Sequence, residues 1–327
     1  MRRLSLSLLI LAACGSTDDD GGDLADASSG DIGAEDSSSA ADTAANTDPG
    51  TGDTTTTEGD SESGDDSESD GDDSDDSGEP PPPPPTMTPG CGMAPTGDVL
   101  DGVITVRDVE RTYLIEIPAD YDPEIPYPLI FGFHGDSGDS SNAQNGYRLF
   151  DHYKGQAIVV YPDGSGAGGS PSWDTAAGGS DVEMVMAIAQ EIGLEMCFDL
   201  NRVHAFGFSR GGIMSNAMGC YRGDFFTGIG AASASAPSTG LCQGPVAVHL
   251  SHGEMDSTIS FASGTSARDG WLGLNGCSEE TIPVEPEGCV EYQGCEPGAP
   301  VVWCQFPGAH SFNGTYAEAA VALFESL

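Results

Sequence analysis

A serine between two glycines is the feature that most constrains this chain. The motif Gly207-Phe-Ser209-Arg-Gly211 interrupts an apolar stretch that runs from Val203 to Met214. The residues before the motif are typical of a buried strand, and apolar residues recur at helical spacing after it. A serine on so tight a strand-to-helix turn has an exposed hydroxyl, and glycine neighbours avoid a clash there. The motif alone is weak in a chain with 46 glycines. An ordinary loop with an incidental serine is the alternative, so its partners must decide.

A serine nucleophile needs a base and an acid that orients the base, since a free hydroxyl reacts poorly at neutral pH. In hydrolases built on this turn, the acid and then the histidine follow the serine along the chain. Residues 246–251 are typical of a buried strand, and Asp256 follows them closely. Residues 301–306 form the next such strand and lead to His310. We therefore predict Asp256 as the acid and His310 as the base for Ser209.

Both partners have alternatives. Glu254 lies two residues before Asp256, and Asp269 lies on the next expected helix. Of the six histidines, His310 alone follows a strand and is C-terminal to both Ser209 and Asp256. The other five are expected to be structural or at the surface: His204 and His249 within strands, His152 at the end of a helix, and His134 and His252 bonded to loop backbone at strand ends.

A developing oxyanion requires two backbone donors, one from the residue after the nucleophile and one from the loop after an early strand. Arg210 supplies the first donor. The apolar strand at residues 129–134 ends at His134-Gly135-Asp136, and we assign the second donor to Gly135 or Asp136. The alternative is that this sequence is only a strand-ending turn.

The remaining elements predict an α/β domain over residues 91–327. Apolar runs predict strands near 112–117, 129–134, 158–161, 203–208, 226–232, 246–251 and 301–306, and periodic segments predict helices near 181–195, 210–220 and 316–326. This alternation predicts a mostly parallel sheet covered by helices on both faces.

The chain resembles the secreted esterases of the polyhydroxybutyrate depolymerase and feruloyl esterase group, related to carbohydrate esterase family 1. The resemblance rests on Phe133-His-Gly135, Tyr161-Pro-Asp-Gly164, Gly207-Phe-Ser-Arg-Gly-Gly-Ile-Met214, His252-Gly-Glu-Met-Asp256 and Gly308-Ala-His310. It covers about Cys91 to Leu327 and implies an α/β-hydrolase fold and serine ester hydrolysis. Members of the group act on aromatic esters of plant cell walls, acetylated xylan or bacterial polyesters. Members often carry Pro and Trp after the histidine, whereas this chain has Ser311-Phe-Asn-Gly314, which puts an aromatic wall from that loop in doubt.

The N-terminus predicts export and a lipid anchor. Met1-Arg-Arg3 is basic, residues 4–13 are apolar, and Leu11-Ala-Ala-Cys14 matches a lipobox. The segment is too short for a mature membrane span. It resembles a bacterial lipoprotein signal peptide (residues 1–13), with Cys14 lipidated on an outer membrane or cell surface. A plain secretory signal with a stray cysteine is the alternative.

Residues 14–90 are expected to form a tether. Their composition is dominated by Asp, Ser, Thr, Gly and Ala, and no Lys or Arg occurs between Arg3 and Arg107. Such a segment buries too little apolar surface to offset its ordering entropy, and it repels itself. Residues 80–85 are a run of prolines, which is a stiff spacer.

Net charge excludes some partners. The chain has a formal net charge of −43, and even residues 91–327 hold 30 acidic against eight basic side chains. Nucleic acid is therefore excluded as a partner, and a polyanionic substrate such as pectate is disfavoured. We expect no cofactor and no metal ion.

Nine cysteines leave eight once Cys14 is assigned to the lipid, an even number in an exported protein. We expect disulfides and favour Cys277 with Cys304. A zinc site at Cys277, Cys289, Cys295 and Cys304 is disfavoured, because the spacing lacks a Cys-x-x-Cys knuckle.

Trp173 is the candidate substrate contact. It lies in a glycine-rich insertion at residues 166–179, before Asp181, which resembles a helix N-cap. Trp173 either stacks on an aromatic or sugar ring or pins its own loop. Phe208 is expected to pack the turn, and Trp271 and Trp303 to lie in the core.

Two other function classes compete with the esterase. One is a surface lipoprotein whose hydrolase domain only binds glycan or polyester, and the other is a serine peptidase or acyltransferase on the same fold. Labelling by a fluorophosphonate separates the first from the enzymes, and turnover of esters but not amides separates the rest.

Overall fold

The computed structural model describes residues 86–96, 98–166 and 172–327. The predicted signal peptide, Cys14 and residues 15–85 of the predicted tether lie outside the described residues. The last part of that tether belongs to the folded domain. Thr88 is 5% exposed, donates to the Met196 carbonyl (2.7 Å) and accepts from the Phe198 amide (3.0 Å). The domain boundary expected at Cys91 therefore lies too late by at least three residues.

A single ten-stranded sheet organises the described chain, in the order β1-β2-β4-β3-β5-β6-β7-β10-β9-β8. The strands are β1 (Val103–Val106), β2 (Val109–Glu116), β3 (Tyr127–Phe133), β4 (Ile158–Pro162), β5 (Phe198–Phe208), β6 (Gly228–Ala232), β7 (Ala247–Gly253), β8 (Thr281–Val284), β9 (Cys289–Tyr292) and β10 (Val301–Phe306). The six strands from β4 to β10 are mutually parallel, and the two strands beyond each end pair antiparallel. The predicted mostly parallel sheet is confirmed.

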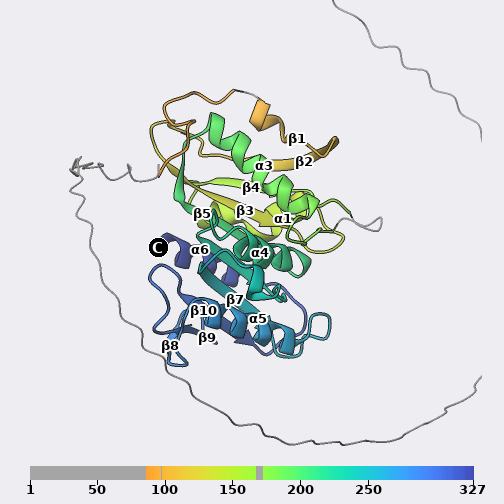
Figure 1. The fold of residues 1–327 in the computed structure, drawn as a ribbon, viewed down its shortest axis with the longest axis vertical. Coiled ribbons are helices and arrows are strands. Elements are labelled where there is room, and N and C mark those ends of the chain that lie inside the picture. Colours follow the sequence, from red (N-terminus) through yellow and green to blue (C-terminus); the bar gives the residue numbers. More distant parts are fainter. Residues whose placement is uncertain (1–85, 97, 167–171) are drawn as a thin grey trace, which may run out of the picture. The chain divides into compact units, whose positions relative to one another are not determined.

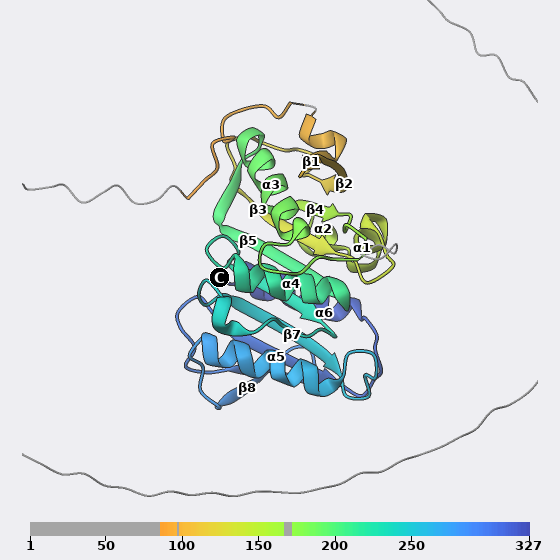
Figure 2. The same cartoon turned by 45° about the vertical axis from the view of Figure 1, so that its right-hand side comes forward.

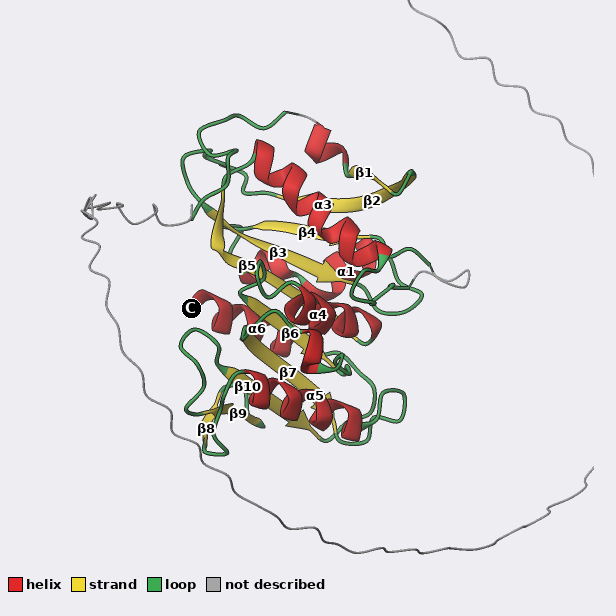
Figure 3. Cartoon of the chain, in the orientation of Figure 1, coloured by secondary structure: helices red, strands yellow, loops and turns green. Residues whose placement is uncertain are grey.

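Helices cover both faces of the sheet (Figures 1 and 3). One face packs against α3 (Ser180–Glu195), α4 (Arg210–Tyr221) and α5 (Phe261–Leu274), and these three helices lie in front of the sheet in Figure 2. The other face packs against α1 (Ser140–Tyr147), α2 (Leu149–His152) and α6 (Gly314–Glu325). The alternation of side chains along a strand explains the two cores: Phe131 faces the first set of helices, whereas Ile130 faces the second. Two short 3₁₀ helices are η1 (Asp98–Asp101) and η2 (Thr239–Leu241).

The elements that the sequence analysis did not predict lack a strong apolar period. α1 is mostly polar, and a reciprocal pair of hydrogen bonds between Asp139 and Asn142 caps its N-terminus. The hairpin of β8 and β9 extends the sheet at its edge, and β8 is almost entirely exposed. Neither has the amphipathic pattern that identifies a buried element.

Four disulfides cross-link the domain: Cys91–Cys197, Cys220–Cys242, Cys277–Cys295 and Cys289–Cys304. The predicted pairing of Cys277 with Cys304 is wrong, and so is the zinc alternative, because all four of its cysteines are oxidised in pairs. Cys304 lies directly opposite Cys289 in the β10–β9 register, a neighbour that only the unpredicted hairpin provides. Disulfides are typical of proteins that fold outside the cytosol, which agrees with the predicted export.

No helix within the described residues is long and apolar enough to cross a bilayer.

Candidate active site

Ser209 lies on the turn between β5 and α4, as the motif predicts. Its backbone has φ 58° and ψ −122°, an unusual conformation for a residue with a side chain. The flanking glycines are required sterically. A Cβ on Gly211 would lie 1.9 Å from the Phe133 carbonyl oxygen, and one on Gly207 would lie 2.3 Å from the carbonyl carbon of Gly211. The turn therefore holds the Ser209 hydroxyl in one place at the carboxyl end of the central strand.

Loops at the carboxyl ends of β7 and β10 bring the other two predicted residues to Ser209. His310 Nδ1 lies 2.7 Å from Asp256 Oδ2, and His310 Nε2 lies 2.8 Å from Ser209 Oγ. An ionised carboxylate only accepts hydrogen bonds, so Nδ1 carries the proton and donates to Asp256. Nε2 is then free to accept from the Ser209 hydroxyl. Ser209 and His310 are 101 positions apart in the sequence, and the parallel sheet brings them together.

Asp256 is held ionised at this site. Its side chain has no solvent exposure, and its Oδ1 accepts from the amides of Thr258 (2.9 Å) and Ile259 (3.0 Å). Burial alone raises the pKa of Asp256, but the hydrogen bonds from His310, Ile259 and Thr258 outweigh that effect and lower the pKa below its usual value. A carboxylate with a lowered pKa stays negative and holds the imidazole in one tautomer.

Neither alternative acid occupies this position. Glu254 is exposed on the same loop, and Asp269 is exposed on α5, where it pairs with Arg268 (2.6 Å). His252 supports the loop in the predicted way, since its Nε2 lies 2.8 Å from the Ile259 carbonyl oxygen and donates to it. Asp256 is thus the carboxylate that faces His310.

The remaining histidines also have the expected environments. His204 and His249 are buried in β5 and β7, and burial lowers the pKa of His204 to about 3 and that of His249 to about 4. His152 ends α2 and is partly exposed. Burial keeps His204 and His249 neutral near pH 7.

The predicted oxyanion loop lies directly beside Ser209. A Cβ added to Gly135 would lie 3.9 Å from Ser209 Cβ. Across residues 86–96, 98–166 and 172–327, no hydrogen bond uses the amide of Asp136 or that of Arg210. Both amides are therefore available to an oxygen bound next to Ser209, and Asp136 is the better candidate of the two loop residues because it also lines the cleft.

A cleft of about 420 Å³ opens above Ser209. Its walls combine apolar and polar side chains: Asp136, Ser172, Ser209, Arg210, Ile213, Thr258 and Ile259. Its size is within the range of small-molecule sites.

The expectation that Trp173 stacks on a substrate ring is wrong. Trp173 is 0% exposed, and its Nε1 donates to the His134 carbonyl (2.8 Å). Its ring packs against Phe133 and His134 with centroid distances of 5.1 and 4.6 Å. The alternative, that Trp173 pins its own loop, describes the structure. Trp271 and Trp303 are buried in the core as predicted.

Aromatic rings back the imidazole of His310. Phe208 lies beside it with a ring distance of 4.8 Å, and Phe312 packs against Phe208 and Tyr147 at 5.9 and 5.0 Å. The loop after His310 therefore does contribute an aromatic side chain, although the Pro and Trp common in the family are absent. Both phenylalanines are half-buried and join the core on the α6 face.

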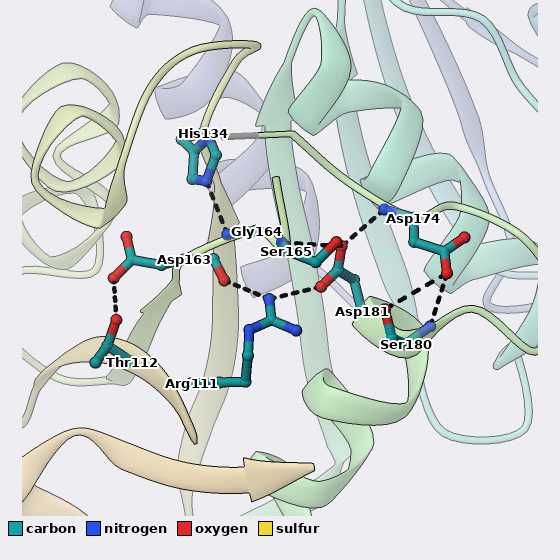
Figure 4. Close-up of polar contacts among 9 residues, drawn as sticks. All are labelled: Arg111, Thr112, His134, Asp163, Gly164, Ser165, Asp174, Ser180 and Asp181. Carbon is teal, nitrogen blue, oxygen red and sulfur yellow. Dashed lines mark hydrogen bonds and ion pairs between the residues drawn. The ribbon is translucent and has the colours of Figure 1, made fainter. Parts of the chain in front are cut away.

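A buried charge cluster near the cleft was not predicted from the sequence. Asp181 was expected to cap α3, but the N-cap is Gly179. The Asp181 carboxylate instead contacts Arg111, Ser165 and Asp174 (Figure 4). The available signal was an arginine within the alternating pattern of a strand, where a charge that faces the core needs a partner.

Comparisons with known proteins place the chain in a family. No family model matches the chain. The chain is 32% identical to "Probable feruloyl esterase C" of Aspergillus niger, over 68% of this chain and 83% of the relative. It is 34% identical to "Feruloyl esterase D" of Neurospora crassa, over 68% and 81%. Among solved structures, the acetyl xylan esterase from Aspergillus awamori superposes with a TM-score of 0.52 at 15% identity, over 66% of this chain and 94% of that chain. The chain therefore belongs to the feruloyl esterase family of carboxylic ester hydrolases and has the α/β-hydrolase fold.

Proposed function

We propose that this protein is an extracytoplasmic serine esterase that uses Ser209, His310 and Asp256 to hydrolyse feruloyl or acetyl esters of plant polysaccharides. Polyhydroxybutyrate is the alternative substrate. One observation carries the proposal: a continuous hydrogen-bonded path from Ser209 Oγ through the imidazole of His310 to the buried Asp256. The names of the relatives support the substrate class.

Acylation begins when Ser209 Oγ attacks the ester carbonyl carbon. His310 Nε2 takes the hydroxyl proton as the bond forms, and Asp256 stabilises the resulting imidazolium. The carbonyl oxygen becomes an oxyanion, and the amides of Arg210 and Asp136 donate to it. When the intermediate collapses, the imidazolium returns its proton to the departing alcohol, and the acyl group remains on Ser209.

Deacylation repeats the same steps with water. His310 Nε2 removes a proton from water, the hydroxide attacks the acyl carbon, and Ser209 Oγ leaves with the proton from the imidazolium. The free acid and the unchanged enzyme result. Apart from the ester and water, the steps use only side chains and amides of this chain.

The cleft supports a neutral acyl substrate. Ile213 and Ile259 offer apolar contact, and Asp136, Ser172 and Thr258 offer hydrogen-bonding groups. The acidic surface of the domain disfavours negatively charged polymers.

Replacement of Ser209 tests the proposal. Ser209→Ala should abolish turnover of methyl ferulate, acetylated xylan and aryl acetates, because the oxyanion donors cannot replace a covalent intermediate. The folded variant should also lose labelling by a fluorophosphonate. Ser311→Ala is the matched control, since Ser311 is an exposed serine next to His310, and it should retain wild-type turnover. An active Ser209→Ala protein would refute the proposal, and hydrolysis of amides as readily as esters would favour a peptidase.

We also propose a lipid anchor at Cys14, supported by the lipobox Leu11-Ala-Ala-Cys14. Cys14→Ser should prevent lipidation and release the protein from membranes, since acyl chains and not a spanning helix would hold it. Membrane retention of the serine variant in cell fractionation would contradict the anchor.

A further inference from the structure

We infer that the buried ion pair of Arg111 and Asp181 positions the oxyanion loop beside Ser209. This inference rests on the proposed function, because positioning matters only if an oxyanion forms there. Arg111 lies on β2 and Asp181 in the first turn of α3. Neither residue touches the reacting atoms, so both are positioning residues.

The pair is almost sealed from solvent. Arg111 Nη2 lies 2.6 Å from Asp181 Oδ1, and the side chains are 9% and 0% exposed. Buried ion pairs contribute little net stability, because desolvation offsets their attraction. They do fix geometry, since a misplaced partner leaves a buried charge unpaired.

The pair binds two chain segments together. Arg111 Nη2 also donates to the Asp163 carbonyl (2.7 Å), and Asp181 Oδ2 accepts from Ser165 Oγ (2.8 Å) and from the Asp174 amide (2.7 Å). Ser165 and Asp174, one from each segment, therefore meet at one carboxylate, and Asp163 is held by its arginine partner (Figure 4). The two segments, residues 163–165 and 172–174, lie so close that a Cβ on Gly164 would be 2.1 Å from the Ser172 carbonyl oxygen.

These same segments hold His134 on two sides. The Gly164 amide donates to His134 Nε2 (3.0 Å), and Trp173 Nε1 donates to the His134 carbonyl (2.8 Å). Gly164 follows Asp163 directly, and Trp173 directly precedes Asp174. Each contact to His134 thus lies one residue from an atom that the ion pair fixes.

His134 transmits this position to the oxyanion loop. Its Nε2 accepts from Gly164, so its Nδ1 carries the proton and donates to the Gly135 carbonyl (2.7 Å). The Arg210 guanidinium donates to the Trp173 carbonyl (2.8 Å). Residues on both sides of the expected oxyanion site are thereby tied to the two segments that the ion pair joins.

The position of the oxyanion loop should affect kcat, because an oxyanion hole depends on preorganised donors. An oxyanion hole stabilises the transition state only if its amides are fixed in advance, and loss of one donor costs about 100- to 1,000-fold in turnover. A loosened loop should cost less than a missing donor. We therefore expect an effect on kcat of about 10- to 100-fold with little effect on KM.

The experiment compares Asp181→Asn with Glu183→Gln in the full-length chain. Glu183 lies in the same helical turn and pairs with Arg107, but that pair is 52% and 47% exposed, so it is the matched control. Three quantities are measured for both variants and the unaltered protein: kcat and KM for an aryl ester, and the inhibition constant of a trifluoromethyl ketone, whose adduct with Ser209 places an oxyanion in the site.

Asp181→Asn should lower kcat by about 10- to 100-fold with KM within about twofold, and the inhibition constant of the ketone should rise by the same factor as kcat falls. Glu183→Gln should change none of these by more than about twofold. If Asp181→Asn does not fold, Arg111→Lys is measured instead. Lysine keeps the charge but offers a different donor geometry, so the same parallel loss is expected on a smaller scale.

The possible outcomes distinguish the two proposals. Absence of ester turnover by the unaltered chain would overturn the proposed function and this inference together. Turnover by the unaltered chain with equal behaviour of Asp181→Asn and Glu183→Gln would overturn the inference alone. A fall in kcat without a matching rise in the inhibition constant would also overturn it, because the loss would then not come from the oxyanion site.

Discussion

Two buried aspartates lie near Ser209, and they have similar surroundings but different basic partners. Asp256 and Asp181 both have side chains with no solvent exposure. Each accepts hydrogen bonds from backbone amides and from one basic side chain. The basic partners differ: Asp256 faces His310, which is 17% exposed, whereas Asp181 faces Arg111, which is 9% exposed.

The partner decides what each carboxylate can do. An imidazole exchanges protons near neutral pH, so a carboxylate fixed against His310 can support proton transfer to and from Ser209. A guanidinium keeps its proton at any ordinary pH, so a carboxylate fixed against Arg111 can only hold structure in place. Under the two proposals, Asp256 therefore serves the chemistry and Asp181, equally buried, serves the geometry.

Replacement of the first carboxylate should have the largest effect. Asp256→Asn should lower kcat by about 10,000-fold, because an amide at this position favours the wrong histidine tautomer. Glu254→Gln, on the same loop but exposed, is the control and should lower kcat by less than about threefold. Steady-state kinetics with an aryl ester measure both. A crippled Glu254→Gln with a mild Asp256→Asn would mean that the acid is misassigned.

Replacement of the basic partner should reverse the order of the two sites, so that the Asp181 site shows the larger loss when the free energy of unfolding is measured. Arg111→Met leaves Asp181 buried without its cation and should lower the free energy of unfolding by about 3 to 5 kcal/mol. His310→Ala should lower it by only about 1 kcal/mol, because solvent can enter beside the partly exposed His310 and reach Asp256. Urea unfolding at pH 7 measures both. Equal losses would remove the distinction between a structural and a chemical carboxylate.

A buried histidine, unlike the exchangeable His310, should make the stability of the fold depend on pH. The pKa of buried His204 is lowered to about 3, whereas the unfolded chain binds a proton near its ordinary value of about 6.5. Between these values the unfolded state is favoured as pH falls, so His204 should cost up to about 1.4 kcal/mol of stability per pH unit below pH 6. His204→Gln retains an acceptor for the Tyr153 hydroxyl but does not titrate.

Urea unfolding from pH 6 to pH 4 measures this effect. As pH falls, the free energy of unfolding of His204→Gln should decrease less steeply than that of the wild type. The difference in slope should correspond to about one proton bound on unfolding. Identical slopes would show that His204 is not the titrating group. The same test on His249 should give the same sign, since burial lowers the pKa of His249 to about 4.

The smallest effect is expected from the acidic N-terminal region. A protein of residues 77–327 should match full-length Cys14→Ser in kcat/KM for a soluble aryl ester within about twofold, because the cleft and its donors lie within the folded domain. A large loss of turnover per folded molecule would mean that the acidic region contributes to the site.

Truncation to Cys91 should lower stability, since it removes the buried Thr88 and its hydrogen bonds to Met196 and Phe198.

The sequence by itself determined which side chains meet at the candidate active site. Apolar runs identified the central strands, and Ser209, Asp256 and His310 each follow the end of such a run. The carboxyl ends of parallel strands meet at one edge of a sheet, so residues in these loops converge whatever their separation in sequence. The order of the elements was therefore sufficient to select the side chains that the structure brings into contact.

Only the tertiary structure decided which segments meet away from that edge. The burial of Trp173, the pairing of Cys304 with Cys289 and the contact of Arg111 with Asp181, 70 residues apart, depend on packing between elements. Local periodicity indicates that a side chain faces inward, but it does not indicate which of many possible neighbours that side chain contacts. The relative positions of strands and helices select one of them, and for Arg111 and Asp181 the burial of two charges makes that choice strict.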